Sequence, residues 1–198
     1  MNNKRSPQFQ IRIHGRGGQG VVTSAELISI AAFNEHQYSQ AFPSFGSERM
    51  GAPVVSYCRI SPNPIRTHEP VTQPDCIIIQ DPTLIHQIDV FEGITKETFV
   101  LINTVSALES PSLQIPSAAA NLENFVTVPA SAIAQKHIGK DVMNVPMLGA
   151  LAAFTGIVSL ESVKHAVRER FPGSIGEFNI LAAEEAYSAI QDSVAERR

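Results

Sequence analysis

A glycine-rich loop is the segment whose residue types and spacing most directly suggest chemistry. Residues 14–20 read His-Gly-Arg-Gly-Gly-Gln-Gly, and Gly15, Gly17 and Gly20 satisfy the GxGxxG pattern between an expected strand and an expected helix. Such a loop presents backbone N–H groups at the start of the helix, where an anion is stabilised. The pattern is compatible with a dinucleotide site, with a structural turn, and with a loop that faces a partner subunit or its ligand.

The surrounding residues argue against the dinucleotide site. A nucleotide-binding Rossmann fold also needs an acidic residue about 20 positions further on, at the end of the second strand. The next strand-like segment, residues 38–42, has no carboxylate, and Glu35 lies in the expected turn before it. Arg16 and Gln19 place long side chains where a dinucleotide loop usually has small ones. We therefore expect either a structural turn or a loop that faces a partner or its ligand.

A second loop, residues 41–53, has the composition of a contact surface. It reads AFPSFGSERMGAP and is too rich in glycine and proline for regular structure. Loops of this length inside a compact domain are usually functional or disordered. Phe45, Glu48, Arg49 and Met50 combine aromatic, ionic and thioether groups, a mixture typical of interfaces. We expect an interface patch here, and the alternative is a solvated loop with an internal contact between Glu48 and Arg49.

Sequence patterns on either side of these loops predict the strands and helices of one α/β domain spanning residues 1–198. Short β-branched runs bounded by turn residues predict strands at 9–14, 54–60, 76–80, 99–103 and 125–128. Two of these runs, 77–79 and 100–102, do not alternate, which indicates strands covered on both faces. Apolar residues at helical spacing predict helices near 21–34, 160–171 and 178–190, with Ser159 as an N-cap. We therefore expect three layers around a mainly parallel sheet, with a helix-rich C-terminal third.

Composition narrows the class of protein. The 198 residues are 43% hydrophobic and 17% charged, which excludes intrinsic disorder. The net charge is −4 and no run of Lys or Arg is long enough to follow phosphates, so we expect no nucleic acid as a partner. The longest apolar stretch, residues 147–158, is too short for a bilayer span, and no secretory signal begins the chain. These observations predict a cytoplasmic protein without a membrane partner.

Individual polar residues give no catalytic or metal site. Cys58 and Cys76 lie outside any CxxC motif, so this chain alone cannot bind an iron–sulfur cluster or a structural zinc ion. We expect two buried free thiols, with a disulfide as the alternative. His14 ends the first strand at the glycine loop, and a structural histidine is favoured there over a general acid or base. Asp81 follows the third strand as either an N-cap or a polar group directed at the same end of the sheet as Gly17.

Several longer motifs together resemble one known family. They lie in order between about Ile11 and Glu185 and include IRIHGRGGQGVVTSAELISIAAF, QAFPSFGSERMGAPVVSYCRI, IIIQDPTL and NVPMLGA. These motifs are similar to those of the gamma subunit of the 2-oxoacid:acceptor oxidoreductases, of which pyruvate:ferredoxin oxidoreductase is the best-known member. One departure is Met50, where the family often has a second arginine after the Glu-Arg pair.

The resemblance implies a complex that oxidatively decarboxylates a 2-oxoacid with coenzyme A to an acyl-CoA and CO₂. In this family thiamine diphosphate and Mg²⁺ belong to the alpha and beta subunits, and [4Fe–4S] clusters belong to a ferredoxin-like delta subunit. An NAD-reducing flavoprotein subunit can be a further partner. The gamma chain is then catalytically silent alone and binds none of these cofactors by itself. The substrate stays open among pyruvate, 2-oxoglutarate, branched-chain and aryl 2-oxoacids such as phenylglyoxylate, and the acceptor between ferredoxin and NAD.

The same resemblance assigns the two loops to assembly. It implies that nine residues face the partner subunits or their ligand: Gly15, Arg16, Gly17, Gly18, Gln19, Gly20, Phe45, Glu48 and Arg49. Arg16 and the loop N–H groups would be suited to a phosphate of coenzyme A. Two alternatives remain, a stand-alone NAD- or FAD-binding protein that uses the GxGxxG loop and an interaction module unrelated to 2-oxoacid chemistry.

Overall fold

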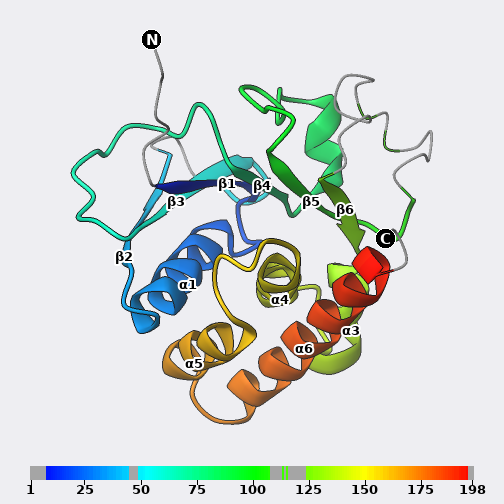
Figure 1. Cartoon of the computed structure of the whole chain (residues 1–198). Coiled ribbons are helices and arrows are strands. Elements are labelled where there is room, and N and C mark those ends of the chain that lie inside the picture. The colour runs from blue at the N-terminus through cyan, green and yellow to red at the C-terminus, as the bar shows by residue number, and fades with distance from the viewer. Residues whose placement is uncertain (1–7, 45–48, 108–112, 114, 116–123, 196–198) are drawn as a thin grey trace.

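The computed structural model describes residues 8–44, 49–107, 113, 115 and 124–195, and it shows an α/β fold built on one sheet (Figure 1). The strands are β1 (Phe9–Arg16), β2 (Tyr38–Pro43), β3 (Pro53–Ser61), β4 (Cys76–Ile79), β5 (Phe99–Asn103) and β6 (Phe125–Val128). The helices are α1 (Val21–Asn34), the 3₁₀ helix η1 (Pro82–His86), α3 (Ala130–Ile138), α4 (Asn144–Thr155), α5 (Leu160–Arg170) and α6 (Ser174–Ala195).

The sheet is mainly parallel, as predicted. Its strand order is β2-β3-β1-β4-β5-β6. The neighbours β1, β4, β5 and β6 are parallel, whereas β3 is antiparallel to both β1 and β2. Only β3 therefore runs against the other strands. Its pairing with β1 extends as far as Arg16 opposite Pro53, so β1 continues two residues beyond its predicted end at His14.

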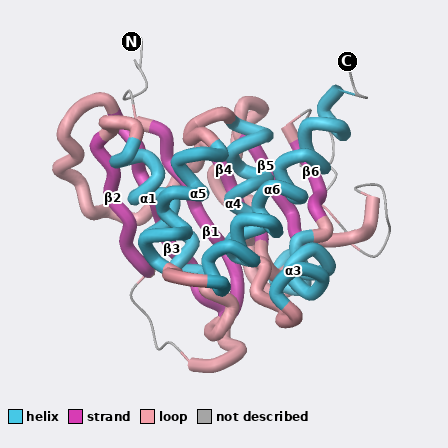
Figure 2. Tube along the Cα trace, turned by 90° about the horizontal axis from the view of Figure 1, so that it is seen from below, coloured by secondary structure: helices cyan, strands magenta, loops and turns pink. Residues whose placement is uncertain are grey.

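Both faces of the sheet are covered, which confirms the three-layer arrangement. The helices α1, α3, α4, α5 and α6 lie on one face (Figures 1 and 2), and η1 with its neighbouring loops covers part of the other. Consecutive residues of β4 enter different cores: Ile78 packs with the helices, while Ile77 and Ile79 pack with Leu84 of η1. This burial on both sides explains why the strand sequences show no alternation of apolar and polar residues.

The helices that were predicted from apolar spacing and capping residues lie close to their predicted positions. The bounds of α1 match the prediction, and Ser159 caps α5 by accepting a hydrogen bond from the Ser162 amide at 3.1 Å. Helix α6 begins at Ser174, four residues before its expected start. Helices α3 and α4 were not predicted. Residues 144–152 of α4 are all buried, so this helix has no polar face and no amphipathic period to detect.

Cys58 and Cys76 are free and buried, on the strands either side of Ile11 in β1, which confirms the prediction of two buried thiols. Within the described part of the chain, no helix is long and apolar enough to cross a membrane.

Candidate functional site

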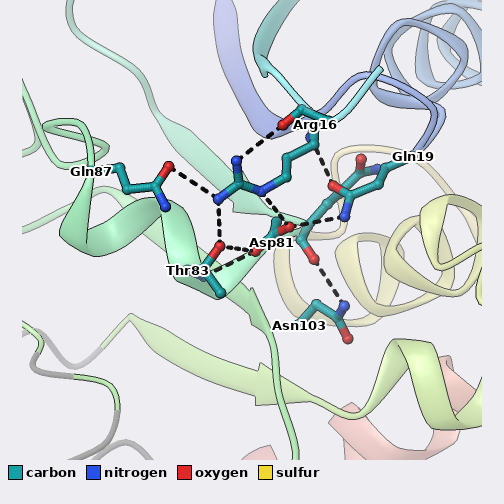
Figure 3. Close-up of polar contacts among 8 residues, drawn as sticks. Arg16, Gln19, Asp81, Thr83, Gln87 and Asn103 are labelled. Carbon is teal, nitrogen blue, oxygen red and sulfur yellow. Dashed lines mark hydrogen bonds and ion pairs between the residues drawn. The ribbon is translucent and has the colours of Figure 1, made fainter. Parts of the chain in front are cut away.

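The glycine loop lies at the edge of the sheet where the parallel strands end. It leaves β1 at Arg16 and enters α1 at Val21. The segment after β4 and the last residue of β5 lie at the same edge, because parallel neighbours present their carboxyl ends together. Figure 3 shows that Arg16 and Gln19 of the loop point toward Asp81, Thr83 and Gln87, with Asn103 nearby. Ligands commonly bind at this edge of an α/β sheet.

The Arg16 guanidinium joins the glycine loop to η1 and to the second loop. Its Nε donates to Asp81 Oδ2 at 2.9 Å, and its Nη2 donates to Thr83 Oγ1 at 2.7 Å and Gln87 Oε1 at 3.1 Å (Figure 3). Its Nη1 donates to the Gly51 carbonyl at 3.1 Å. All three guanidinium nitrogens are therefore engaged within the chain. Arg16 is placed to hold the loop in shape, and a phosphate would have to compete with these acceptors for its donors.

Asp81 has both of the roles that its sequence position suggested. Its Oδ1 accepts from the Thr83 amide and caps η1, while its Oδ2 accepts from Gln19 Nε2 at 3.0 Å as well as from Arg16. Burial of this carboxyl disfavours its charged form. The hydrogen bonds from Thr83 and Gln19, together with the charge of Arg16, outweigh that effect and lower its pKa. Asp81 is therefore ionised at neutral pH and organises this end of the sheet.

The second loop pairs with the glycine loop to form one surface. The Gly17 amide donates to the Ala52 carbonyl at 2.9 Å, and the Gly51 amide donates to the Gly17 carbonyl at 3.0 Å. A Cβ at position 17 would overlap the carbonyl oxygen of Arg49, so only glycine permits this approach. Met50 is exposed beside Gly18. The structure thus brings two loops together that the sequence identified separately.

Not every predicted residue reaches this surface. Gly15 is buried and pairs with Val54 in the sheet, and a Cβ there would meet the side chain of Val21 at 2.6 Å. Gly15 is therefore part of the sheet beneath the loop and is not exposed on the loop surface. Phe45 and Glu48, and with them the suggested internal contact of Glu48, lie outside the described residues.

The first turn of α1 has no capping side chain. Its N-cap, Gly20, has the left-handed conformation with φ 73°, and the first turn contains no acidic residue. The amide groups at this end of the helix carry a partial positive charge that no carboxylate of the turn offsets. The end of α1 therefore favours a negatively charged group from elsewhere.

A pocket of about 490 Å³ opens beside Gly20. Its walls come from the glycine loop, the start of α1, the segment joining α3 to α4, and the region where α5 leads into α6. Lys140 is the one charged residue among the described residues that line it, and Asn144 and Asn179 are buried polar residues in its wall. The full lining comprises Gly18, Gln19, Gly20, Thr23, Ile138, Lys140, Val142, Asn144, Phe171, Ile175, Phe178 and Asn179.

His14 serves the fold, in agreement with the structural interpretation. Its buried ring accepts a hydrogen bond at Nε2 from Arg12 Nε at 3.0 Å. Burial, reinforced by the nearby Arg12 charge, lowers the pKa of His14 to about 3. The ring is therefore neutral at physiological pH and is not suited to acid–base catalysis there. Arg12 itself donates to the backbone carbonyls of Val71, Val90 and Glu92, and so fastens two loops over the sheet.

The side chains of the described residues form no cluster suited to a metal centre. Among the described residues, no group of three or more His, Cys, Asp or Glu side chains converges on a point. The two cysteines lie on β3 and β4 with β1 between them, and burial raises the pKa of the Cys58 thiol to about 12. Two thiols are also fewer than the four thiolate ligands that a [4Fe–4S] cluster requires.

The residues that form the pocket wall opposite the glycine loop were not predicted from the sequence. Lys140, Asn144 and Asn179 lie more than 100 positions from Gly20, and none of the three belongs to a motif with a catalytic or binding signature. The motif containing Asn144 supported only the family resemblance. Folding of α4 against α1 and α6 brings these residues to the loop.

Comparisons with known proteins agree on one family. The model for "Pyruvate ferredoxin/flavodoxin oxidoreductase" matches residues 10–189. Pyruvate synthase subunit PorC of Methanothermobacter marburgensis is 42% identical over 185 residues, covering 93% of this chain and 99% of that protein. The pyruvate/ketoisovalerate oxidoreductases common subunit gamma of Thermococcus kodakarensis is 42% identical over 180 residues, covering 91% and 96%. The crystal structure of pyruvate oxidoreductase subunit PORC from Thermotoga maritima superposes with a TM-score of 0.79 at 32% identity, covering 92% of this chain and 97% of that one.

Proposed function

Because the chain belongs to the pyruvate ferredoxin/flavodoxin oxidoreductase family, we propose that it is the gamma subunit of a cytoplasmic 2-oxoacid:acceptor oxidoreductase complex. The complex would decarboxylate a 2-oxoacid oxidatively with coenzyme A, giving an acyl-CoA and CO₂. The observation that carries this proposal is similarity along nearly the whole chain to relatives whose names designate a subunit PorC and a common subunit gamma. Their length matches that of this chain, so the similarity extends beyond one shared motif.

The geometry does not favour the alternative of a stand-alone NAD- or FAD-binding protein. Glu35, the carboxylate nearest to the expected spacing, follows the far end of α1. The 14 residues of that helix separate it from the glycine loop by about 20 Å, at roughly 1.5 Å per residue. Its carboxylate instead accepts a hydrogen bond from the Ser159 amide at 2.7 Å. It therefore cannot hold the ribose of a dinucleotide bound at the loop.

Within this proposal the contribution of the chain is assembly. The surface formed by the glycine loop and residues 49–52 faces the alpha and beta subunits, which hold thiamine diphosphate and Mg²⁺. The [4Fe–4S] clusters would belong to the ferredoxin-like delta subunit, since the two cysteines of this chain are fewer than the four thiolates that such a cluster requires. An NAD-reducing flavoprotein subunit would join only if NAD is the acceptor.

Coenzyme A enters as a substrate of the complex, and any contact with this chain would use backbone N–H groups of the glycine loop. Arg16 positions that loop, since its guanidinium is engaged by Asp81, Thr83, Gln87 and Gly51. We expect Arg16→Ala to reduce stability and to leave the KM for coenzyme A within about twofold of the wild-type value. A large rise in KM at unchanged stability would instead assign the guanidinium to the substrate.

Anaerobic purification of the tagged chain from its native cells tests the proposal. The eluate is analysed for co-purifying subunits, iron and thiamine diphosphate. It is then assayed for coenzyme A-dependent reduction of ferredoxin or NAD with pyruvate, 2-oxoglutarate, a branched-chain 2-oxoacid and phenylglyoxylate. Active partners that carry iron and thiamine would support the subunit assignment and identify the substrate. A chain that purifies alone would contradict it, and a thermal-shift titration with NAD and FAD would then test the alternative.

A further inference from the structure

The pocket beside Gly20 has an apolar wall that the chain leaves open. Ile175 and Phe178 lie one turn apart near the start of α6, and their side chains remain 61% and 48% exposed. Ile138, Val142 and Phe171 continue the wall around the pocket. Apolar pockets of this kind commonly receive an anchor side chain of a partner protein.

Two buried carboxamides in this wall have unused hydrogen-bonding capacity. Asn144 is only 8% exposed, and within the described chain its carboxamide has no hydrogen-bond partner. Asn179 is 5% exposed, and its Nδ2 donates to the Ile175 carbonyl at 2.8 Å. That bond fixes the orientation of the amide and leaves Oδ1 as an acceptor for another group. A ligand in the pocket can therefore supply hydrogen-bond partners to these two carboxamides.

The charge of the pocket is positive. Among the described residues that line it, Lys140 is the only one with a charged side chain, and the uncapped end of α1 adds the partial charge of its amide groups. No carboxylate lines the pocket within the part of the chain that the structure describes. A negatively charged group is therefore favoured at the side of the pocket formed by Lys140 and Gly20.

We propose that this pocket receives an extended segment of a partner subunit in which an apolar side chain neighbours an Asp or Glu. The apolar side chain would pack between Ile175 and Phe178, and the carboxylate would lie between Lys140 and the start of α1. Peptide groups of the segment would supply the partners that Asn144 and Asn179 lack.

A peptide fits this set of groups better than a free phosphate does. A phosphate offers acceptors only at the oxygens that face a basic site, whereas Asn179 Oδ1 requires a donor. A peptide N–H provides that donor, and the apolar wall favours a side chain. The inference rests on the proposed function, because the partner is a subunit of the same complex.

The test uses purified subunits and measures the affinity of this chain for the rest of the complex under anaerobic conditions. The variants are Lys140→Glu and Phe178→Ser. The matched controls are Lys96→Glu, in the loop before β5, and Phe33→Ser, whose side chain is 71% exposed at the far end of α1. We expect each pocket variant to raise the Kd by about tenfold or more and each control to change it less than about twofold. Circular dichroism and the Tm of each isolated variant verify that it is folded.

The outcomes separate this inference from the proposed function. If the wild-type chain does not associate with thiamine- and iron-bearing subunits, the proposed function fails and this inference fails with it. If the wild type and both pocket variants associate equally well, the docking inference alone is overturned. Normal association with a raised KM for coenzyme A would also overturn it, by assigning the pocket to the substrate. Restored affinity of Lys140→Glu with a partner in which one acidic residue is changed to Lys would support it directly.

Discussion

The Asp81 carboxylate is the group on which the arrangement of the glycine loop depends, and its removal has a calculable effect. It accepts from the Thr83 amide at 3.0 Å, Thr83 Oγ1 at 2.6 Å, Arg16 Nε at 2.9 Å and Gln19 Nε2 at 3.0 Å. Loss of an N-cap costs about 1 kcal/mol. Loss of the hydrogen bonds to the charged Arg16 and to Gln19 costs about 1–2 kcal/mol more, because the site is only partly buried.

Asp81→Ala should therefore lower the free energy of unfolding by about 2–3 kcal/mol. In a domain of this size each kcal/mol lowers the Tm by about 2–4 °C, so the Tm should fall by about 4–12 °C. Urea titration and thermal denaturation, followed by circular dichroism at pH 7, measure both quantities. Asp141→Ala, which removes an exposed carboxylate, is the control. A change of less than about 0.5 kcal/mol for Asp81→Ala would refute the assigned role, since surface substitutions commonly fall within that range.

The pH dependence provides an independent check of the same carboxylate. The pKa of Asp81 is lower in the folded chain than the usual value of about 4, so its stabilising contribution is complete above that value. The contribution is lost as the pH falls through the lowered folded-state pKa. The difference in unfolding free energy between wild type and Asp81→Ala should thus be constant near neutral pH and shrink in acid below about pH 4. A difference that persists undiminished at the lowest pH at which the wild type still folds would contradict this explanation.

Three further predictions concern other parts of the chain. Gly20→Ala should destabilise the chain more than Gly139→Ala in urea titrations. Both glycines have φ 73°, a conformation that costs an alanine about 1–2 kcal/mol. Only the new Cβ at position 20 also meets a neighbouring atom, at 2.8 Å, which adds to the cost there. Burial raises the pKa of the Cys58 thiol to about 12 and that of Cys76 further, so a thiol reagent at pH 8 should label both only after denaturation, and rapid labelling of the native chain would refute this. His14, with its pKa lowered to about 3, should show no NMR titration near pH 6.5, and its burial as the neutral form should contribute stability above that pH that is lost as the pH falls toward 3.

Residue patterns over short distances were sufficient to predict most of the secondary structure. The apolar stripe of α1, the cap at Ser159 and the β-branched runs of β4 and β5 depend on residues a few positions apart, and these elements lie where expected. Helix α4 was missed because a helix buried on all sides has no polar face to produce a period. The direction of β3 was equally hidden, since a strand has the same sequence pattern in either orientation.

In the candidate site, too, some features were predictable from the sequence and others depended on the packing of the chain. The sequence alone determined that a glycine-rich turn leads into α1 and that a second irregular loop follows β2, because turns require particular residue types. The tertiary structure decided what these loops do: it engaged Arg16 with Asp81, 65 positions away, and brought Lys140 and Asn144 beside Gly20. Such contacts arise where parallel strands end at a common edge and where helices pack across it. They depend on the packing of whole elements, which the spacing of residues along the chain does not specify.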